Sequence, residues 1–154
     1  MKTLSLLTLL LFCIQQKHPS AYTPNFIDPT GTYTLKGNVK NNNITGHFGE
    51  LRVHLLDSQT VAFCFYLSNG YPTYAAATIL DTLQYSDNFI KFRPKGDSSC
   101  SLILTFSARS VELMKVYSDP STGCGFTPGI IVPVVLNKTS SAVPVIQDFA
   151  TGGR

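Results

Sequence analysis

The chain has 154 residues, the usual length of one domain, and its 44% hydrophobic and 14% charged residues exclude an intrinsically disordered protein. Of its 12 basic residues, Lys2 and Lys17 lie in a predicted targeting segment, which leaves 10 basic against 9 acidic residues. Such a nearly neutral chain lacks the clustered positive charge that binds a phosphate backbone. We therefore expect no nucleic-acid partner.

Residues 1–21 are expected to be an export signal. Lys2 gives the positive start, and residues 4–12 form an apolar run of nine. A membrane-spanning helix needs about 20 residues, and no later run is long enough either. We therefore expect a secreted or periplasmic protein without a transmembrane segment. The alternative is a lipoprotein anchored through Cys13, which Phe12 disfavours because a small residue usually precedes the lipidated cysteine.

Three cysteines follow the signal, and export makes a disulfide between two of them favourable. Cys100 follows the polar loop 95–99, and Cys124 lies in the polar loop 119–125, each beside a strand-like run. Because loop backbones can bring two thiols together, we predict a Cys100–Cys124 bridge and an unpaired Cys64. The bridge closes 23 intervening residues. It should stabilise the fold by about 3 kcal/mol in the chain-entropy description.

In chain order, the body of the sequence reads as strands separated by turns. The first strand-like run, residues 31–39, ends at Lys40 and three asparagines, which tolerate the left-handed backbone of tight turns. The further runs are 50–57, 60–67, 74–85, 88–93, 101–106, 110–117 and 130–136. No stretch shows helical periodicity with caps. The sequence therefore predicts an all-β protein.

Eight short strands with mostly tight connections favour pairing in sequence order. The expected fold is an antiparallel meander of about eight strands that curls into a small closed or partly open barrel. A two-sheet sandwich is the alternative. The predicted domains are a signal peptide (1–21), a linker (22–30), the barrel (31–138) and a C-terminal tail (139–154), of which residues 143–149 are the part suited to docking on the barrel.

One hairpin can be predicted to the level of register. The bulky apolar residues of runs 50–57 and 60–67 fall at odd positions, and a three-residue loop of residues 57–59 brings them onto one face. That loop sets Leu55 opposite Val61, Val53 opposite Phe63 and Leu51 opposite Phe65. Cys64 shares the other face with Arg52 and lies diagonal to His54.

This placement suggests a Cys64 thiolate activated by His54 and Arg52, because adjacent positive charge lowers the pKa of a thiol. The interpretation we favour is an unpaired cysteine covered by the tail or a neighbouring segment. His47 and His54 lie seven apart, on opposite faces of a continuous strand, so a shared metal is not expected. No established catalytic or phosphate-binding motif is present. We predict no catalytic residues, no metal and no cofactor.

The loop from Ser68 to Tyr74 is the strongest candidate contact surface. Its two tyrosines and a proline make a stiff surface that is apolar and also forms hydrogen bonds. The predicted binding residues are Ser68, Asn69, Gly70, Tyr71 and Tyr74. The alternative is a lid that packs on the barrel core.

Three stretches carry a resemblance: Gly31-Thr32-Tyr33 with Gly37-Asn38, residues 81–85, and Cys100 with residues 102–106 followed by Cys124-Gly125-Phe126. The chain from about residue 31 to 138 resembles small exported bacterial proteins and, more loosely, the lysozyme-inhibitor-like β-barrels of the periplasm. The resemblance implies an antiparallel barrel with a Cys100–Cys124 bridge. The Ser-x-Ser-Gly-x-x-Tyr loop of membrane-bound inhibitors of C-type lysozyme is not reproduced by residues 68–74, so no inhibitory residue is carried over.

These observations favour an exported, non-enzymatic binding protein, with a secreted hydrolase such as lysozyme as the first partner to test. A barrel of eight strands that encloses a small apolar ligand is the alternative. A thiol enzyme that uses Cys64 is the third hypothesis.

Overall fold

The computed structural model describes residues 25–117, 124 and 133–149, and this part of the chain is all-β without a helix. Its strands are β1 (Gly31–Leu35), β2 (Asn38–Lys40), β3 (Asn43–Leu55), β4 (Thr60–Gly70), β5 (Ala76–Ser86), β6 (Phe89–Phe92), β7 (Cys100–Phe106), β8 (Ser110–Tyr117) and β9 (Val134–Ser140).

The strands form one antiparallel sheet that closes on itself. Its order is β1-β9-β8-β7-β6-β5-β4-β3-β2, so almost every strand pairs with its neighbour in sequence. β1 pairs with β9 on one side and with β3 on the other, which closes an eight-stranded barrel. β2 is an additional strand along the first part of β3. The predicted antiparallel barrel is confirmed, and the alternative of a two-sheet sandwich is wrong.

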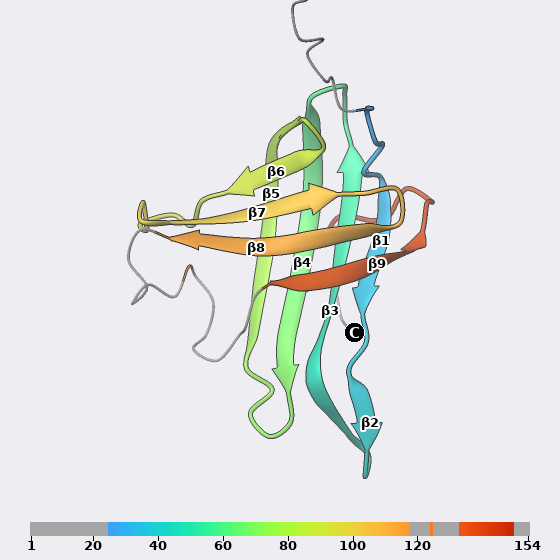
Figure 1. Ribbon diagram of the computed structural model, residues 1–154, viewed down its shortest axis with the longest axis vertical. Coiled ribbons are helices and arrows are strands. Elements are labelled where there is room, and N and C mark those ends of the chain that lie inside the picture. Colours follow the sequence, from blue (N-terminus) through green and yellow to red (C-terminus); the bar gives the residue numbers. More distant parts are fainter. Residues whose placement is uncertain (1–24, 118–123, 125–132, 150–154) are drawn as a thin grey trace, which may run out of the picture.

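The barrel body and a projection from it are distinct in Figure 1. Strands β6, β7, β8 and β9 cross the direction of β3, β4 and β5, while β2, the start of β3 and the β4–β5 turn extend below the crossing strands. We call this projection the arm and define it as residues 36–48 and 69–76. Among the described residues, the hydrophobic core cluster includes none from the arm.

The β3–β4 hairpin has the predicted register. Leu55 pairs with Val61, Val53 with Phe63 and Leu51 with Phe65. The Leu56 amide donates a hydrogen bond to the Thr60 carbonyl oxygen at 2.8 Å, which closes the three-residue loop. A slip of one residue would turn the buried phenylalanines toward solvent, so burial of this face fixes the register.

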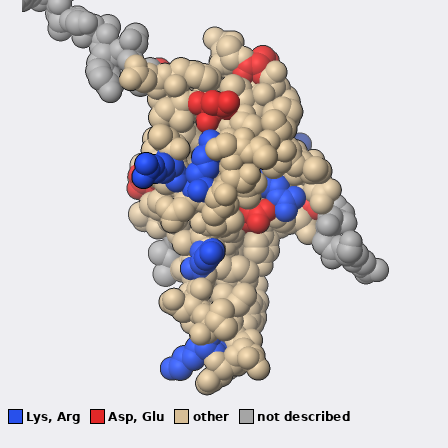
Figure 2. Space-filling view, turned by 90° about the vertical axis from the view of Figure 1, so that its right-hand side faces the viewer, with Lys and Arg blue, Asp and Glu red and all other residues tan. Residues whose placement is uncertain are grey.

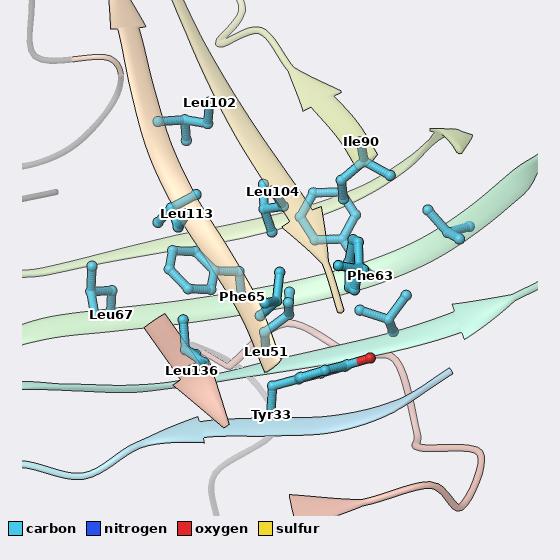
Figure 3. Close-up of a cluster of buried hydrophobic side chains, with 14 of the residues drawn as sticks. Tyr33, Leu51, Phe63, Phe65, Leu67, Ile90, Leu102, Leu104, Leu113 and Leu136 are labelled. Carbon is cyan, nitrogen blue, oxygen red and sulfur yellow. The ribbon is translucent and has the colours of Figure 1, made fainter. Parts of the chain in front are cut away.

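The core fills the space between the crossing strands. Figure 3 shows Phe63 and Phe65 of β4 pointing toward leucines of β7 and β8. Phe106 lies between Tyr33 and Tyr85, with edge-to-face ring centroids 5.7 Å away in both pairs. These side chains are buried, and the interior of the described barrel is packed with apolar groups.

The disulfide pairing is as predicted. Cys100 and Cys124 are bridged, with their Cα atoms 5.3 Å apart, and Cys64 is a free, buried cysteine. Cys100 is also the first residue of β7 and belongs to the core cluster. The bridge therefore links the described Cys124 directly to the barrel.

The strand boundaries differ from the predicted ones chiefly in the arm. The predicted strand 31–39 is interrupted at Lys36 and Gly37, where a Cβ on Gly37 would lie 2.6 Å from Ile44 Cγ2. Asn41 and Asn42 adopt positive φ in the next turn, as the asparagine run predicted. β3 begins at residue 43 rather than 50, and β4 continues to residue 70 rather than 67.

Both predicted end segments contribute to the barrel. The Tyr85 hydroxyl donates to the Ile27 carbonyl oxygen at 2.6 Å, and the Tyr33 hydroxyl donates to the Pro29 oxygen at 2.9 Å, so residues from the predicted linker cap the core. β9 runs to Ser140, two residues past the predicted end of the barrel domain. The predicted run 130–136 begins outside the described residues.

Candidate functional site

The predicted contact loop is divided between a strand and a turn. Ser68, Asn69 and Gly70 end β4, because Ser68 is paired with Phe48 and with Ala76 in the sheet. The turn proper is residues 71–75. The predicted loop from Ser68 is therefore shorter than expected, since the hydrogen-bonded ladder continues to the end of β4.

Of the predicted binding residues, the two tyrosines are presented to solvent. Tyr71 is 53% exposed and Tyr74 is 40% exposed. Asn69 is half-buried, and Ser68 and Gly70 are buried. The Ser68 hydroxyl accepts a hydrogen bond from the Gly70 amide at 3.2 Å, so this pair fixes the end of β4 instead of offering a contact surface.

The close approach of Gly70 explains why the turn needs a glycine there. A Cβ on Gly70 would lie 2.5 Å from the Gly46 carbonyl oxygen and 2.7 Å from the Ile44 oxygen, and its φ of +71° is in the left-handed region. The Tyr71 amide next to it donates to the Ile44 oxygen at 2.7 Å. The β4–β5 turn is thereby tied to the start of β3.

Tyr74 has an unusual backbone conformation for a bulky residue. Its φ is +49°, a left-handed value that costs a non-glycine residue about 1–3 kcal/mol and persists only where the surrounding structure holds it. Its amide donates to the Gly70 oxygen at 2.8 Å, and its hydroxyl accepts a hydrogen bond from the Ile44 amide at 3.2 Å. Residues held in strained conformations cluster at functional sites. This strain marks the turn as a candidate site.

The exposed tyrosines begin a line of aromatic rings, which we call the aromatic strip: Tyr71, Tyr74, Phe48, Tyr66 and Phe149. The successive ring centroids are 6.5, 6.4, 6.0 and 5.9 Å apart. The strip runs from the arm along the outward face of β3 and β4. Aromatic pairs at such distances stabilise one another beyond the area they bury, so the exposed end is continuous with a supported row of rings.

An apolar groove adjoins the strip on the arm. It has a volume of about 300 Å³, and Phe48 belongs both to it and to the strip. Its lining residues are Leu35, Lys36, Gly37, Val39, Ile44 and Phe48. The arm therefore offers rings and a shallow apolar surface side by side.

The charge of the arm is one-sided. Lys36 and Lys40 are its formally charged residues, and neither arm segment contains Asp or Glu. Figure 2 shows basic and no acidic side chains on the viewed face of the projecting lower end, whereas both signs occur on the body above. A surface of this kind complements neutral or acidic partners.

Cys64 is on the same face as Arg52, as predicted, and is paired directly with it. His54 is paired with Ala62, two residues before Cys64, and is therefore diagonal to the cysteine. The cysteine has no exposed surface. Burial raises the pKa of the Cys64 thiol, and hydrogen bonding from the Gln147 backbone and the charge of Arg52 offset this only in part. The Arg52 Nε donates to Glu50 Oε1 at 2.6 Å. This environment keeps the thiol protonated, in contrast to an activated nucleophile.

The segment that covers Cys64 is residues 143–149, the predicted docking part of the tail. The Arg52 guanidinium lies over the Phe149 ring, 5.0 Å from its centroid. A cover by the tail is the interpretation that the sequence favoured for Cys64.

Within the described ranges, no cluster of three His, Cys, Asp or Glu side chains is placed to hold a metal ion. The same ranges contain no helix of the length and apolarity that crossing a membrane requires.

Sequence reasoning missed Phe48, Tyr66 and Phe149. A signal existed for Tyr66: in the run 60–67 the bulky core residues are at odd positions, so an aromatic residue at an even position faces outward. Phe48 preceded the predicted strand and had no face assigned. Phe149 lies outside the strands, and its contact with Tyr66 depends on the path that the tail takes across the sheet, which the sequence did not predict.

The chain matches no protein-family model, and searches of curated proteins and of solved structures find no similar protein. The resemblance to lysozyme-inhibitor-like barrels therefore stays a prediction.

Proposed function

We propose that this chain is an exported, non-enzymatic binding protein that contacts a protein partner through the end of the arm, centred on Tyr71 and Tyr74. The observation that carries this proposal is the presentation of two exposed tyrosines on a turn whose backbone is tied to β3. Tyrosine is among the residues that dominate interface energies, and a rigid turn loses little conformational entropy when it binds.

The shape and charge of the arm support the same proposal. The arm projects beyond the crossing strands and carries Lys36 and Lys40 without a carboxylate. Its groove and aromatic strip provide the apolar centre of a contact, and its asparagines provide a polar rim. A projecting surface of this kind fits a concave, neutral or acidic site. The first 21 residues and the Cys100–Cys124 bridge support export.

The two other hypotheses receive less support. Buried aromatic and leucine side chains occupy the described barrel interior, which disfavours a small apolar ligand enclosed there. The covered, protonated Cys64 disfavours a thiol nucleophile.

The first experiment measures binding of the mature chain, residues 22–154, to a C-type lysozyme, with lysozyme activity as a second readout. If lysozyme does not bind, immobilised mature chain is used to capture a partner from secreted proteins, and the same variants are compared with that partner. Tyr71→Ala and Tyr74→Ala are each expected to weaken binding by about 1–3 kcal/mol.

Tyr117→Ala is the matched control, because Tyr117 is 46% exposed but lies on β8, outside the arm. Its substitution should leave the affinity unchanged. If Tyr71→Ala, Tyr74→Ala and Tyr117→Ala all bind with the wild-type affinity, the contact surface lies outside the end of the arm. A hydrolytic or redox activity that Cys64→Ser abolishes would overturn the binding proposal.

A further inference from the structure

The C-terminal segment 143–149, which we call the strap, lies across the outward face of β3 and β4. The Arg52 Nη1 donates to the Val145 carbonyl oxygen at 3.5 Å, and the Phe149 ring packs against Tyr66 with centroids 5.9 Å apart. The Gln147 backbone hydrogen-bonds the Cys64 thiol. These contacts place the strap over an otherwise outward-facing row of β3 and β4 side chains.

The burial of Cys64 is evidence that the strap covers this face. It is paired with Arg52 and Leu80, and it shares its face with Tyr66 rather than with the core residues Phe63 and Phe65. A side chain on the outward face of an exposed sheet meets solvent. Cys64 nevertheless has no exposed surface, and the strap, whose Gln147 backbone hydrogen-bonds the thiol, contributes to this burial.

The strap is held differently from the strands. It forms no strand, and it packs on the face of the sheet instead of joining an edge. Val143 is 62% exposed and Val145 is 68% exposed. Segments with few buried apolar groups open at a lower free energy than the strands they cover. The strap is therefore suited to leave while the barrel remains folded.

The end of the strap also occupies the aromatic strip. Phe149 lies between Tyr66 and the Arg52 guanidinium, at the opposite end of the strip from Tyr71 and Tyr74. An aromatic ring in this position gains both an aromatic pair and a cation–π contact. The chain's own tail thus shows which chemistry this surface accepts: a segment outside the sheet that places an aromatic side chain between Tyr66 and Arg52.

We propose that the strap is a displaceable, autoinhibitory cover, and that an aromatic segment of a protein partner takes the place of Phe149 against Tyr66 and Arg52. Release of the strap removes Phe149 from the strip, so that the contact surface extends from the arm past Phe48 to Tyr66 and Arg52, and it exposes Cys64. The role of the partner rests on the proposed binding function. The displacement of the strap does not, and it can be measured on the protein alone.

The experiment measures the reaction of Cys64 with Ellman's reagent in the native, disulfide-bonded mature chain, where Cys64 is the one thiol outside the bridge. The wild-type reaction is expected to be slow. Phe149→Ala removes the ring pair and the cation–π contact, and it is expected to speed the reaction on the order of tenfold. Circular dichroism verifies that the variant remains folded.

The matched control is Phe26→Ala. Phe26 also lies in a terminal segment and packs edge-to-face on a barrel tyrosine, Tyr85, at 5.9 Å. It does not cover Cys64, so its substitution should leave the thiol reaction unchanged. Arg52→Gln is a second test variant, because it removes the partner of Val145 and Phe149 from the barrel side.

A synthetic peptide of residues 143–149, added to the Phe149→Ala protein, should restore protection of Cys64 in a saturable manner, and a scrambled peptide should not. The proposal is overturned if Phe149→Ala and Arg52→Gln react at the wild-type rate, or if the thiol becomes reactive only with global unfolding. If a partner has been found, Phe149→Ala should tighten its binding and the partner should expose Cys64. If the variants speed the thiol reaction but the partner neither binds Phe149→Ala more tightly nor exposes Cys64, the strap is a displaceable cover and the proposed role of the partner is wrong.

Discussion

The barrel body and the arm are built from the same strands, yet they are stabilised in different ways. In the body, β4 buries Phe63 and Phe65 among side chains from β1, β3, β7 and β8, and the disulfide ties Cys124 to β7. In the arm, continuations of β3 and β4 are held by backbone hydrogen bonds between turns, with Tyr71 and Tyr74 exposed.

This difference teaches how a small barrel can present a rigid contact surface. The body supplies the apolar burial that compensates for the lost chain entropy. The arm adds little burial, but two hydrogen bonds to Ile44 hold the turn: the Tyr71 amide donates to the Ile44 carbonyl oxygen, and the Tyr74 hydroxyl accepts from the Ile44 amide. Stability and contact surface are therefore separable, and substitutions in the two regions should have different effects.

The largest effect on stability is expected in the body. Phe63→Ala removes a ring with no exposed surface. It should lower the free energy of unfolding by about 3–5 kcal/mol. Val39→Ala is the control in the arm, because Val39 is 76% exposed and its removal leaves no cavity. Urea unfolding followed by circular dichroism measures both, and similar losses would remove the distinction between body and arm.

Loss of the disulfide is expected to have the next largest effect. The double variant Cys100→Ser, Cys124→Ser removes the constraint on the unfolded chain between the two positions. It should destabilise the fold by about 3 kcal/mol. Reduction of the wild type should have the same consequence. If the folded double variant binds a partner with unchanged affinity, the arm works independently of the bridge. A loss of affinity without unfolding would couple the two regions.

A pH-dependent effect is expected at Tyr85, which is buried in the core of the body. Burial, and after it the negative charge of Asp28, raises the pKa of Tyr85 to about 12, so folding favours the neutral phenol. Its stabilising contribution is fully present below the unfolded pKa, which is about 10, and is lost as the pH rises toward 12. Unfolding measured between pH 9 and 12 should show a steeper loss for the wild type than for Tyr85→Phe.

At neutral pH, Tyr85→Phe removes the hydrogen bond to the Ile27 carbonyl oxygen, at a cost of about 1 kcal/mol. Equal pH dependence in the two proteins would assign the alkaline loss to other groups.

The smallest effect on stability is expected at the end of the arm. Tyr71→Ala should change the free energy of unfolding by about 0.5 kcal/mol or less, because the ring is 53% exposed. The same variant should have a large effect on partner binding. Thermal unfolding and affinity measured on one preparation test this separation. A strong loss of stability would make Tyr71 a structural residue of the turn.

The β3–β4 hairpin shows what alternation can predict. Residues 51–55 and 61–67 have their bulky apolar side chains at odd positions, and a three-residue loop, unlike a two-residue loop, places both sets on the same face. The arm was less accessible to this reasoning. Ser68 and Gly70 carry polar or turn-forming signals, yet Ser68 continues the ladder of β4, Gly70 meets the backbone of residues 44 and 46, and both residues are buried.

The sequence by itself determined the all-β class, the register of the β3–β4 hairpin and the Cys100–Cys124 pairing, because these depend on local periodicity, turn residues and a small set of cysteines. Only the tertiary structure decided the closure of the barrel, the projection of the arm and the position of the strap. Arg52 and Val145 are 93 positions apart. Their contact depends on the pairing of β1 with both β3 and β9 and on the path of the chain after β9, and no local pattern records either.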